Sequence, residues 1–455
     1  MPLDILTPPK TEGVFALPVT QLRACNEATV RRMIAAGERD AERLLAALGT
    51  WPREWPEGLP VRLSFLGVCL TFACDMQPRC IYCNQRPVCE TMGIEDWKAL
   101  VRGLAPVEGD GPYLYITGGE PLLLGEDLWG HEGLIHTATE SRAACNINTN
   151  ALLLTPEASE GLVRAGLGRV HISLDTHRPE VQDAIYQQTG RWEQVVQGIR
   201  NLQAAKSALG VSHPLVHINC VLTRLNAFDL PEFLAFLLDM KPLVDEGLSP
   251  DFDFHLIPVG GEANRDLRLS AAEYERFFTE TWEAADVVWQ RYQADRGVPE
   301  DKRGKLHEKL PFCSPYHRVQ HRGSLAEWAA CAGEGRPASL SLTPRCYVAP
   351  TQSFVLPDGS QFWCGGHSVS RPEPVGNVLE HSVQDNIRAA MPQLAALPAP
   401  HCRNCPGATQ AINQIVENSL RDLIAEWVAE ADAPGSAPRG NVPPASASDL
   451  NEEYA

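Results

Sequence analysis

The amino-acid sequence predicts an α/β fold, and three observations support this prediction. Short apolar segments alternate with helix-length segments from Val61 to Ile257. This alternation is typical of parallel strands joined by right-handed crossover helices. The chain of 455 residues is long enough for one large domain and a smaller one. Residues 346–410 lack the alternation and are rich in proline, glycine and cysteine, which indicates that the smaller domain lies there.

The first 58 residues are expected to form a helical extension. Apolar residues are spaced among charged ones from Thr20 to Leu48, which predicts one amphipathic helix. Pro52, Pro56 and Pro60 follow, and proline ends helices because it has no backbone N–H.

Residues 59–261 are predicted to form the core domain, with strands and helices in alternation. Most of the strand segments are short and apolar, which is typical of a sheet covered on both faces. The expected strands are Val61–Cys69, Tyr113–Ile116, Ala143–Asn148, Val170–Leu174, Leu215–Leu222 and Phe252–Ile257, and the expected helices are Ile94–Leu104, Leu128–Thr139, Pro156–Ala165, Trp192–Leu209 and Leu230–Leu238.

Three further segments complete the predicted organisation. Residues 262–345 contain several tryptophans and no strand alternation, so we expect a mainly helical connector. Residues 346–432 form the cysteine-rich domain and include a final helix over Ala411–Ala431. Residues 433–455 are rich in Pro, Ser and Ala and acidic at the end, which predicts a disordered tail.

Overall composition restricts the partners and the compartment. Hydrophobic residues make up 44% and charged residues 21%, as in ordinary globular proteins. The net charge of −18 repels phosphate groups, so we expect no nucleic acid and no membrane as partner. No apolar run is long enough to span a membrane, and Met1–Gly13 does not resemble a signal peptide, so we expect a cytoplasmic protein. Fourteen cysteines in that compartment favour metal ligation over disulfides.

The first cysteine cluster follows the first predicted strand. Cys74, Cys80 and Cys83 fall within ten residues, on a loop at the edge where α/β folds place their sites. Three thiolates are one fewer than the four that hold a typical [4Fe–4S] cluster, so one iron would remain open to another ligand. A structural zinc site is the alternative, because a C-x2-C pair also suits zinc.

Polar and glycine-rich segments follow the other predicted strands. Adjacent glycines, as in the segment after the second strand, let a backbone approach a ligand closely. Each segment alone is more often a turn or a helix N-cap. The residues concerned are Gly118, Gly119, Glu120 and Pro121 after the second strand, Asn148 on the third, Ser173 and Asp175 at the fourth, Asn219 and Arg224 around the end of the fifth, and Val259 after the sixth.

Taken in order, these motifs resemble those of the radical SAM superfamily. The usual signature of that superfamily is C-x3-C-x2-C with an aromatic residue before the last cysteine, a position that Tyr82 occupies here. The spacing in this chain is C-x5-C-x2-C, which leaves Cys69 and Cys89 as alternatives to Cys74. We expect Cys69 to point into the sheet and Cys89 to be buried. The resemblance covers Val61 to Gly261 and implies a partial (β/α)6 barrel.

The resemblance also implies the cofactors and their ligands. Cys74, Cys80 and Cys83 would hold a [4Fe–4S] cluster whose open iron binds S-adenosylmethionine (SAM), and reductive cleavage of SAM would produce a 5′-deoxyadenosyl radical. An electron donor such as flavodoxin or ferredoxin would be needed. Arg224 would pair with the SAM carboxylate. The other implied SAM contacts are Tyr82, Gly118, Gly119, Glu120, Pro121, Asn148, Ser173, Asp175, Asn219 and Val259.

A second cysteine set lies in the C-terminal region: Cys346, Cys364, Cys402 and Cys405. The Pro-Asp-Gly turn within Val355–Cys364 predicts a β-hairpin between the first two of these cysteines. On spacing alone, zinc and a [4Fe–4S] cluster are comparable occupants. The arrangement resembles the SPASM/twitch auxiliary domains of radical SAM enzymes, which implies a second, fully ligated [4Fe–4S] cluster that transfers electrons.

The resemblance implies a radical SAM oxidoreductase and leaves its substrate open. The cysteine spacing is similar to that of aminocyclitol dehydrogenases, so oxidation of a sugar or cyclitol is the leading hypothesis. A peptide maturase that forms crosslinks or epimerises residues is one alternative, and a zinc-stabilised binding protein without enzyme activity is another. Cys313 and Cys331 are either structural or hydrogen-atom donors.

Overall fold

The computed structural model describes residues 5–9, 16–105, 111–240, 253–260, 262–306, 325–334, 345–370, 373–397, 402 and 407–433. Cys313, Cys405 and the predicted tail from residue 434 lie outside the described residues. Cys331 falls in helix α13.

The described strands form one nine-stranded sheet in the order β6-β5-β4-β3-β2-β1-β7-β8-β9. Neighbouring strands from β6 to β1 are parallel, and β1 also pairs in parallel with β7. The expected α/β fold is therefore confirmed, with parallel strands arranged as in a partial (β/α)6 barrel. The six core strands are β1 Phe65–Cys69, β2 Tyr113–Thr117, β3 Cys145–Thr149, β4 Arg169–Ser173, β5 Leu215–Leu222 and β6 Asp253–Pro258.

The crossover helices differ from the prediction in two places. The helix expected over Leu128–Thr139 is two helices, because the chain turns at Gly130 and Gly133, where an added Cβ would lie within 3 Å of backbone oxygens. Helix α7 was not predicted. The helices of the core are α3 Ile94–Arg102, α4 Glu126–Trp129, α5 Leu134–Glu140, α6 Pro156–Arg164, α7 Pro179–Tyr186, α8 Arg191–Leu209 and α9 Leu230–Met240, with short 3₁₀ turns η1 Pro121–Leu124 and η2 Ala227–Asp229.

The two faces of the parallel sheet have opposite chemical character. The face packed into the main apolar core carries Leu66, Val68, Leu114, Ile116, Ile147, Val170, Ile172, Ile218, Phe254 and Leu256. The other face is mostly polar, because side chains alternate along each strand; it carries Tyr113, Tyr115, Asn146, Asn148, Arg169, His171, Ser173, His217, Asn219 and His255, together with the apolar Leu215, Val221 and Ile257. The strand segments were described as mostly apolar, but in the structure the polar residues among them gather on one face.

The predicted β-hairpin is present and extends the core sheet. Strands β7 Gln352–Val355 and β8 Ser360–Phe362 are antiparallel, and Gly359 takes a φ of +82° in the turn between them. Because β7 also pairs with β1, the hairpin lies beside the strand that leads to the first cysteine cluster. Strand β9, Gly376–Asn377, completes this edge of the sheet.

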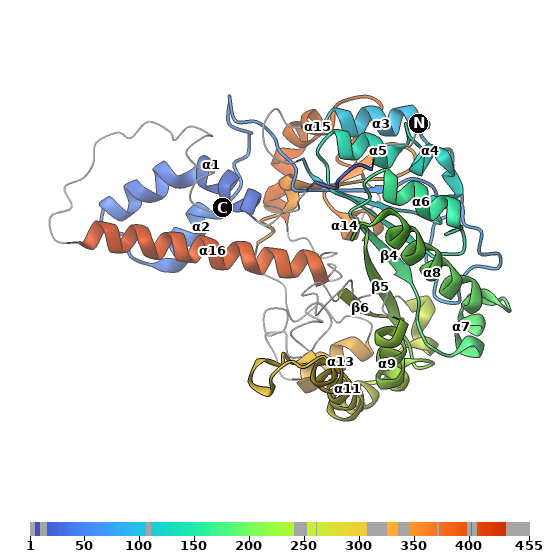
Figure 1. The fold of residues 1–455 in the computed structure, drawn as a ribbon. Helices are drawn as coiled ribbons and strands as arrows, with labels where there is room; N and C mark the ends of the chain where they lie inside the picture. Colours follow the sequence, from blue (N-terminus) through green and yellow to red (C-terminus); the bar gives the residue numbers. More distant parts are fainter. Residues whose placement is uncertain are drawn as a thin grey trace.

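Helices from the two ends of the chain pack together beside the sheet (Figure 1). They are α1 Ala16–Ala35, α2 Ala41–Leu48 and α16 Gly407–Asp432. The single helix expected over Thr20–Leu48 is two helices, because the chain turns at Gly37 and Asp40 caps α2 through the N–H of Arg43. Arg31 links α1 to α16. It pairs with Glu430 at 3.0 Å and lies 4.6 Å from the centre of the Trp427 ring.

The remaining described elements are mostly helical. Between the core and the hairpin lie η3 Glu262–Leu267, α10 Ala271–Arg276, the π-helical turn η4 Phe277–Thr281, α11 Trp282–Asp295, η5 Glu300–Lys302 and α13 Leu325–Gly333. Around the hairpin lie η6 Ala349–Thr351, α14 Gly365–Ser370, α15 Val383–Ala390 and η7 Met391–Ala396. Among the described helices, none combines the length and the apolar character needed to cross a membrane.

Candidate active site

The glycine-rich segment after β2 packs against the chain that leads into the first cysteine cluster. Gly119 N–H donates to the carbonyl of Thr71 at 2.7 Å, and Glu120 N–H donates to that of Ala73 at 2.8 Å. A Cβ on Gly119 would lie 1.8 Å from the Ala73 carbonyl oxygen, so only glycine fits there. The two segments therefore position each other directly before Cys74.

Glu120 connects this loop to the end of β3. Its side chain is fully buried, and one carboxylate oxygen accepts the Leu122 N–H at 3.0 Å and the Thr149 hydroxyl at 2.8 Å. The other oxygen accepts the Asn150 N–H at 2.8 Å. Burial raises the pKa of Glu120 to about 7, although these three hydrogen bonds favour the ionised form. Glu120 thus orders two loops, and its contact with SAM remains a prediction.

Asn150 reaches from the end of β3 to the cysteine loop. Its Nδ2 donates to Asp75 Oδ1 at 2.6 Å and lies 3.9 Å from Cys74 Sγ. The predicted SAM contacts included Asn148 of the same segment but not this residue. The signal was present, because Asn146 and Asn148 alternate along β3 and Asn150 follows the strand at the same two-residue spacing.

The three predicted cluster ligands lie near one another as free, partly exposed thiols. Burial raises the pKa of Cys74 to about 11 and that of Cys80 to about 12, and the charges of Asp175, Cys83 and Cys74 contribute to the rise at Cys80. Among the described residues, no three His, Cys, Asp or Glu side chains converge on a point where one metal ion would be held.

The three thiols do not converge on one point, and this arrangement is compatible with an iron–sulfur cluster. Zinc requires four ligands that meet at one ion, at about 2.3 Å for sulfur. A [4Fe–4S] cluster is bound through separate irons, so its cysteines need only surround it. Cys74, Cys80 and Cys83, on one loop at the strand ends, fit that donor set, and a bound metal keeps such thiols deprotonated.

The longer spacing of the cysteine motif is accommodated by the end of α7. Gln187 donates a side-chain hydrogen bond to the carbonyl of Arg79, and Gln188 donates one to that of Pro78 at 3.4 Å. Ile81 N–H donates to the carbonyl of Ile185 at 3.0 Å. The chain between the first two cysteines is therefore anchored from α7.

The two alternative cysteines differ in their surroundings. Cys69 is 3% exposed and packs with Phe72, Leu356 and Phe362, so the expectation that it points into the sheet is confirmed. Cys89 is exposed, so the expectation that it is buried is wrong. The residues around Cys89 have no regular secondary structure.

Tyr82 and Asp175, both predicted as SAM contacts, are hydrogen-bonded to each other. The Tyr82 hydroxyl donates to Asp175 Oδ2 at 2.7 Å, and the Val221 N–H donates to Oδ1 at 2.7 Å. Burial raises the pKa of Asp175 to about 6, against these hydrogen bonds. Gln182, from the unpredicted helix α7, also donates to this carboxylate at 3.4 Å.

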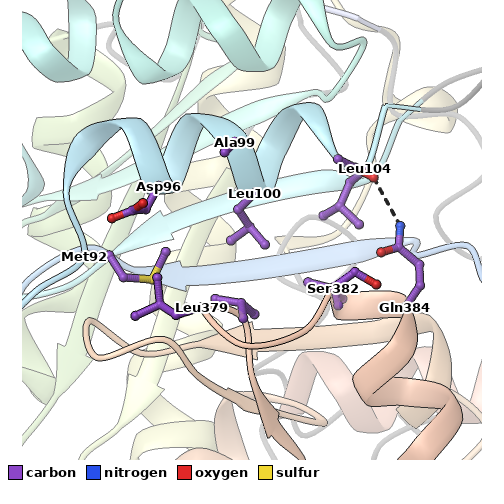
Figure 2. Close-up of a pocket in the computed structure, with 11 residues that line it drawn as sticks. Met92, Asp96, Ala99, Leu100, Leu104, Leu379, Ser382 and Gln384 are labelled. Atoms are coloured by element: carbon purple, nitrogen blue, oxygen red, sulfur yellow. Dashed lines mark hydrogen bonds between the residues drawn. The ribbon is translucent and has the colours of Figure 1, made fainter.

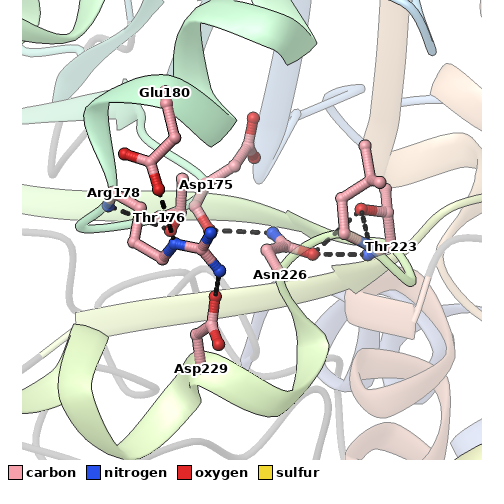
Figure 3. A network of polar contacts seen from close by, with 8 residues as sticks. Asp175, Thr176, Arg178, Glu180, Thr223, Asn226 and Asp229 are labelled. Atoms are coloured by element: carbon pink, nitrogen blue, oxygen red, sulfur yellow. Dashed lines mark hydrogen bonds and ion pairs between the residues drawn. The ribbon is translucent and has the colours of Figure 1, made fainter.

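A polar network behind Asp175 fixes the ends of β4 and β5 (Figure 3). Asn226 donates to the carbonyl of Asp175 at 2.8 Å, and its Oδ1 accepts the N–H of Thr223 at 2.8 Å. Further out, Arg178 pairs with Asp229 at 3.1 Å and Glu180 at 2.9 Å. Asn226 ends the segment Thr223–Asn226, which resembles a radical SAM motif, but it was not among the predicted SAM contacts; its side chain joins two loops that are separate in sequence.

Of the other predicted SAM contacts, some lie beside one another at the strand ends and Arg224 does not. Asn219 Nδ2 donates to Asn148 Oδ1 at 3.4 Å, and Ser173 faces Asn219 in the register of β4 and β5. Pro121 begins η1 next to Glu120, and Val259 is buried directly after β6. Arg224 is instead directed to the surface, where its 46%-exposed side chain lies 3.4 Å from Glu273.

Three members of the second cysteine set lie close together. Burial raises the pKa of Cys346 to about 12, and the charges of Cys364 and Cys402 contribute to this rise. Burial and the charge of Cys402 likewise raise the pKa of Cys364. Trp51, between α2 and β1, donates to the carbonyl of Tyr347 at 3.2 Å, so the N-terminal region packs against this set.

The two cysteine sets are joined by a hydrogen bond. Arg86, which follows Cys83, donates from its guanidinium to the carbonyl of Ser368, which follows Cys364 in α14.

A pocket of about 280 Å³ lies elsewhere, between α3 and residues 378–384 (Figure 2). Its lining is largely apolar and includes Met92, Leu100 and Leu379, and Gln384 crosses it to the carbonyl of Gly103 at 3.2 Å. None of the predicted site residues lines this pocket.

Comparisons with known proteins agree with the motifs. The model of the radical SAM superfamily matches residues 68–237. The GTP 3′,8-cyclase of Peptoclostridium acidaminophilum is 31% identical over 192 residues, which cover 40% of this chain and 54% of that protein. Mycofactocin maturase MftC of Mycobacterium tuberculosis is 33% identical over 168 residues, which cover 36% of this chain and 39% of that protein. This chain thus spans about half of the length of the first of these relatives and less of the second.

A solved structure shares the fold. Native anSMEcpe with bound AdoMet matches with a TM-score of 0.51 and 14% identity, over 80% of this chain and 98% of that one. At this identity the match supports the fold alone.

Proposed function

Because the chain belongs to the radical SAM superfamily, with its radical SAM domain at residues 68–237, we propose that Cys74, Cys80 and Cys83 hold its [4Fe–4S] cluster. These are three neighbouring free thiols on the loop that follows β1. When bound, the cluster and SAM supply a 5′-deoxyadenosyl radical that abstracts hydrogen from a substrate.

The strand ends of the core are proposed to orient SAM beside that loop. Gly118, Gly119, Glu120 and Pro121 would bind the amino-acid part of SAM, since their backbone already packs on the residues before Cys74. Asn148, Ser173, Asp175, Asn219 and Val259 lie at or near the carboxyl ends of β3 to β6, and Tyr82 joins Asp175 to the cysteine loop. Arg224 would have to leave Glu273 to reach a SAM carboxylate.

The second cysteine set is proposed to hold an auxiliary [4Fe–4S] cluster. Cys346, Cys364 and Cys402 supply three neighbouring thiols, and Cys405 would be the fourth ligand. With all four irons ligated by protein, such a cluster is suited to electron transfer. It would accept an electron from the substrate after hydrogen abstraction, which makes the net reaction an oxidation, and flavodoxin or ferredoxin would supply the reducing electron for SAM.

The observation that most favours a hydroxylated small molecule, such as a sugar or cyclitol, is the polar face of the sheet. Phenol, amide and imidazole groups cover this face from β2 to β6, whereas the helix-covered face is apolar. Such groups bind hydroxyls well and bind aliphatic side chains poorly.

Peptide maturation is the second candidate. Mycofactocin maturase is among the relatives by sequence. Many peptide maturases have a winged-helix domain for the peptide, but the described part of residues 1–58 contains α1 and α2 without a strand, packed on α16. A peptide would therefore have to bind elsewhere.

Selective removal of the second cysteine set tests this proposal. We expect the anaerobically reconstituted wild type to contain about eight irons per chain, and Cys346→Ala/Cys364→Ala to contain about four. This variant should still cleave SAM but should no longer oxidise substrate. A colourless wild type with zinc and no iron would contradict both cluster assignments, and loss of SAM cleavage in a folded variant would contradict the separate roles of the two sets.

A further inference from the structure

The second cysteine set comes from separate segments of the chain. Cys346 precedes the hairpin, Cys364 follows it, and Cys402 lies shortly before α16 begins at Gly407. Thiols can share one metal centre only if the segments that carry them are held in fixed relative positions. The contacts between α16 and the segment of Cys346 therefore bear directly on whether this set can hold a metal.

Tyr347, which directly follows Cys346, is hydrogen-bonded to α16 through its backbone and through its side chain. Its backbone N–H donates to Asn413 Oδ1 at 2.7 Å, and its hydroxyl donates to Glu417 Oε2 at 3.2 Å. Asn413 and Glu417 are four residues apart and so lie on one face of the helix. The exposed fractions of Tyr347, Asn413 and Glu417 are 0%, 4% and 2%. We call these three residues the Tyr347 cluster.

Both α16 members of the cluster are held in place by further hydrogen bonds. Asn413 Nδ2 donates to the carbonyl of Thr409 at 3.0 Å, which leaves its oxygen directed to the neighbouring backbone N–H. Glu417 Oε1 accepts from Arg421 at 3.0 Å, and Arg421 also reaches Glu42 of α2 at 2.8 Å. The buried carboxylate is thus paired with a cation, and α2 takes part in the arrangement.

The N-terminal extension encloses the other side of Tyr347. Trp51 Nε1 donates to the carbonyl of Tyr347 at 3.2 Å, so the N–H, the carbonyl and the hydroxyl of this residue all have partners. Gly49, the C-cap of α2, lies against the ring, since a Cβ there would be 2.6 Å from Tyr347 Cε1. The residue next to Cys346 is therefore held by segments from both ends of the chain.

A buried polar cluster of this kind is suited to fixing the register of a helix. Val416 and Leu420 of α16 are also fully buried, and such apolar side chains alone would attach the helix to its neighbours. Buried charged and amide groups contribute little net stability, but they can select one arrangement of two packed elements. A slip of α16 by one turn would displace its N-terminal end by about 5.4 Å and would break both bonds to Tyr347.

We propose that the Tyr347 cluster positions the second metal centre, because it holds Cys346 in register with the cysteines that precede α16. The N-terminal extension takes part in this role through Gly49 and Trp51. It thereby receives a function, although it lies outside residues 68–237 of the radical SAM domain. This inference rests on the proposed function and deepens it, because it names what the second centre requires besides its thiols.

The test measures the metal content and the spectrum of the second centre. Asn413→Leu removes the acceptor of the Tyr347 N–H and keeps a side chain of similar size. In the anaerobically reconstituted full-length protein, we expect this variant to contain about four irons per chain and the wild type about eight. The electron paramagnetic resonance signal that is missing in Cys346→Ala/Cys364→Ala should be missing here too, while SAM cleavage is retained.

Conservative variants separate positioning from packing. Tyr347→Phe keeps the ring and the backbone bond, so we expect the second centre to form but to lose iron to a chelator about tenfold faster, because buried Glu417 loses a partner. Glu417→Gln should retain the second centre better than Glu417→Leu does, since an amide still bonds to a hydroxyl and to Arg421. Equal iron loss in these two variants would contradict a role for the hydrogen bond.

A matched control lies on the exposed side of the same helix. Asn418 is exposed and accepts only a bond from Gln414 among the described contacts, so Asn418→Leu should keep about eight irons. Gly49→Ala approaches the cluster from the N-terminal extension, and we expect it to lose part of the second-centre iron because the Tyr347 ring must move. Circular dichroism shows whether each variant is folded, and Tyr347→Phe replaces Asn413→Leu if the latter is not.

The outcomes separate this inference from the proposed function. If the wild type contains about eight irons and folded Asn413→Leu keeps them with an unchanged signal, the Tyr347 cluster does not position the centre and the proposed function stands. If the second set of the wild type holds zinc, the auxiliary cluster is wrong, and this inference then requires that Asn413→Leu loses that zinc and Asn418→Leu keeps it. A wild type without metal in the second set would contradict both.

Discussion

The hydroxyl of Tyr82 donates a 2.7 Å hydrogen bond to Asp175, and thereby joins the cysteine loop to the end of β4. Tyr82 lies between two proposed cluster ligands, whereas Asp175 is fixed by Val221 and Gln182. The sheet therefore orders the loop through one aromatic side chain.

Tyr82→Phe removes this hydrogen bond and keeps the ring. We expect the free energy of unfolding to fall by about 1–3 kcal/mol, because the buried Asp175 loses a partner. We also expect faster loss of iron to a chelator. Chemical denaturation and iron release measure the two effects, and Tyr292→Phe, in α11, is the control that should change neither. Unchanged stability and iron retention in Tyr82→Phe would show that the loop is ordered in another way.

Gly119→Ala should prevent assembly of the first cluster. The added Cβ would lie 1.8 Å from the carbonyl oxygen of Ala73, so the segment before Cys74 must move. Gly93→Ala is the matched control, because its Cβ would meet only the Asp96 side chain, at 3.4 Å. We expect about four irons in a folded Gly119→Ala variant and about eight in Gly93→Ala. Equal iron content would mean that the two loops do not need this close contact.

Glu120 predicts a pH dependence of stability. Its folded pKa is about 7 against an ordinary value of 4.5, so the folded state binds more protons between these values and its stability falls as pH rises. Glu120→Gln mimics the protonated acid. Without SAM, we expect the stability of this variant relative to the wild type to increase by about 2 kcal/mol from pH 5.5 to pH 8. Denaturant titrations at both pH values measure it, and a constant difference would contradict the raised pKa.

The anchoring of the longer cysteine loop gives a further prediction. Gln187→Ala/Gln188→Ala removes both side-chain hydrogen bonds from the residues after α7 to residues 78 and 79, and also the bonds that Gln188 accepts from Arg191. We expect a folded protein whose first cluster is lost faster to a chelator, since each bond contributes about 0.5–1.5 kcal/mol to holding the loop. Gln197→Ala, which removes an exposed bond to Asn201, should behave like the wild type. If both variants retain iron equally, α7 does not stabilise the loop.

The core could be predicted from the sequence because each of its strands and motifs lies within one short segment of the chain. The parallel strands and the cysteine loop depend on alternation and spacing that a single segment contains. The pairing of β1 with β7 could not be found in this way, because Phe65 and Gln352 are far apart in sequence and nothing local encodes their register. The break before α2 was readable from Gly37 and the capping residue Asp40, but the apolar spacing on both sides concealed it.

The polar face of the sheet was visible in the sequence but was not predicted. In β4 and β5, His171 and His217 alternate with Val170, Ile172 and Ile218, which is the two-residue period of a strand with one polar face. Most of the strands were described as apolar because they are short and rich in aliphatic residues. Which polar residues meet across strands depends on register, so Asn146 and His171 could be paired only in three dimensions.

The most direct test of the central claim is 5′-deoxyadenosine formation after anaerobic reconstitution, with SAM and a strong reductant. We expect the wild type and Cys89→Ala to form it, and Cys74→Ala, Cys80→Ala and Cys83→Ala to form none while they keep the iron of the second cysteine set. If the wild type forms no 5′-deoxyadenosine, or if Cys74→Ala forms it and Cys89→Ala does not, the account of this active site is wrong.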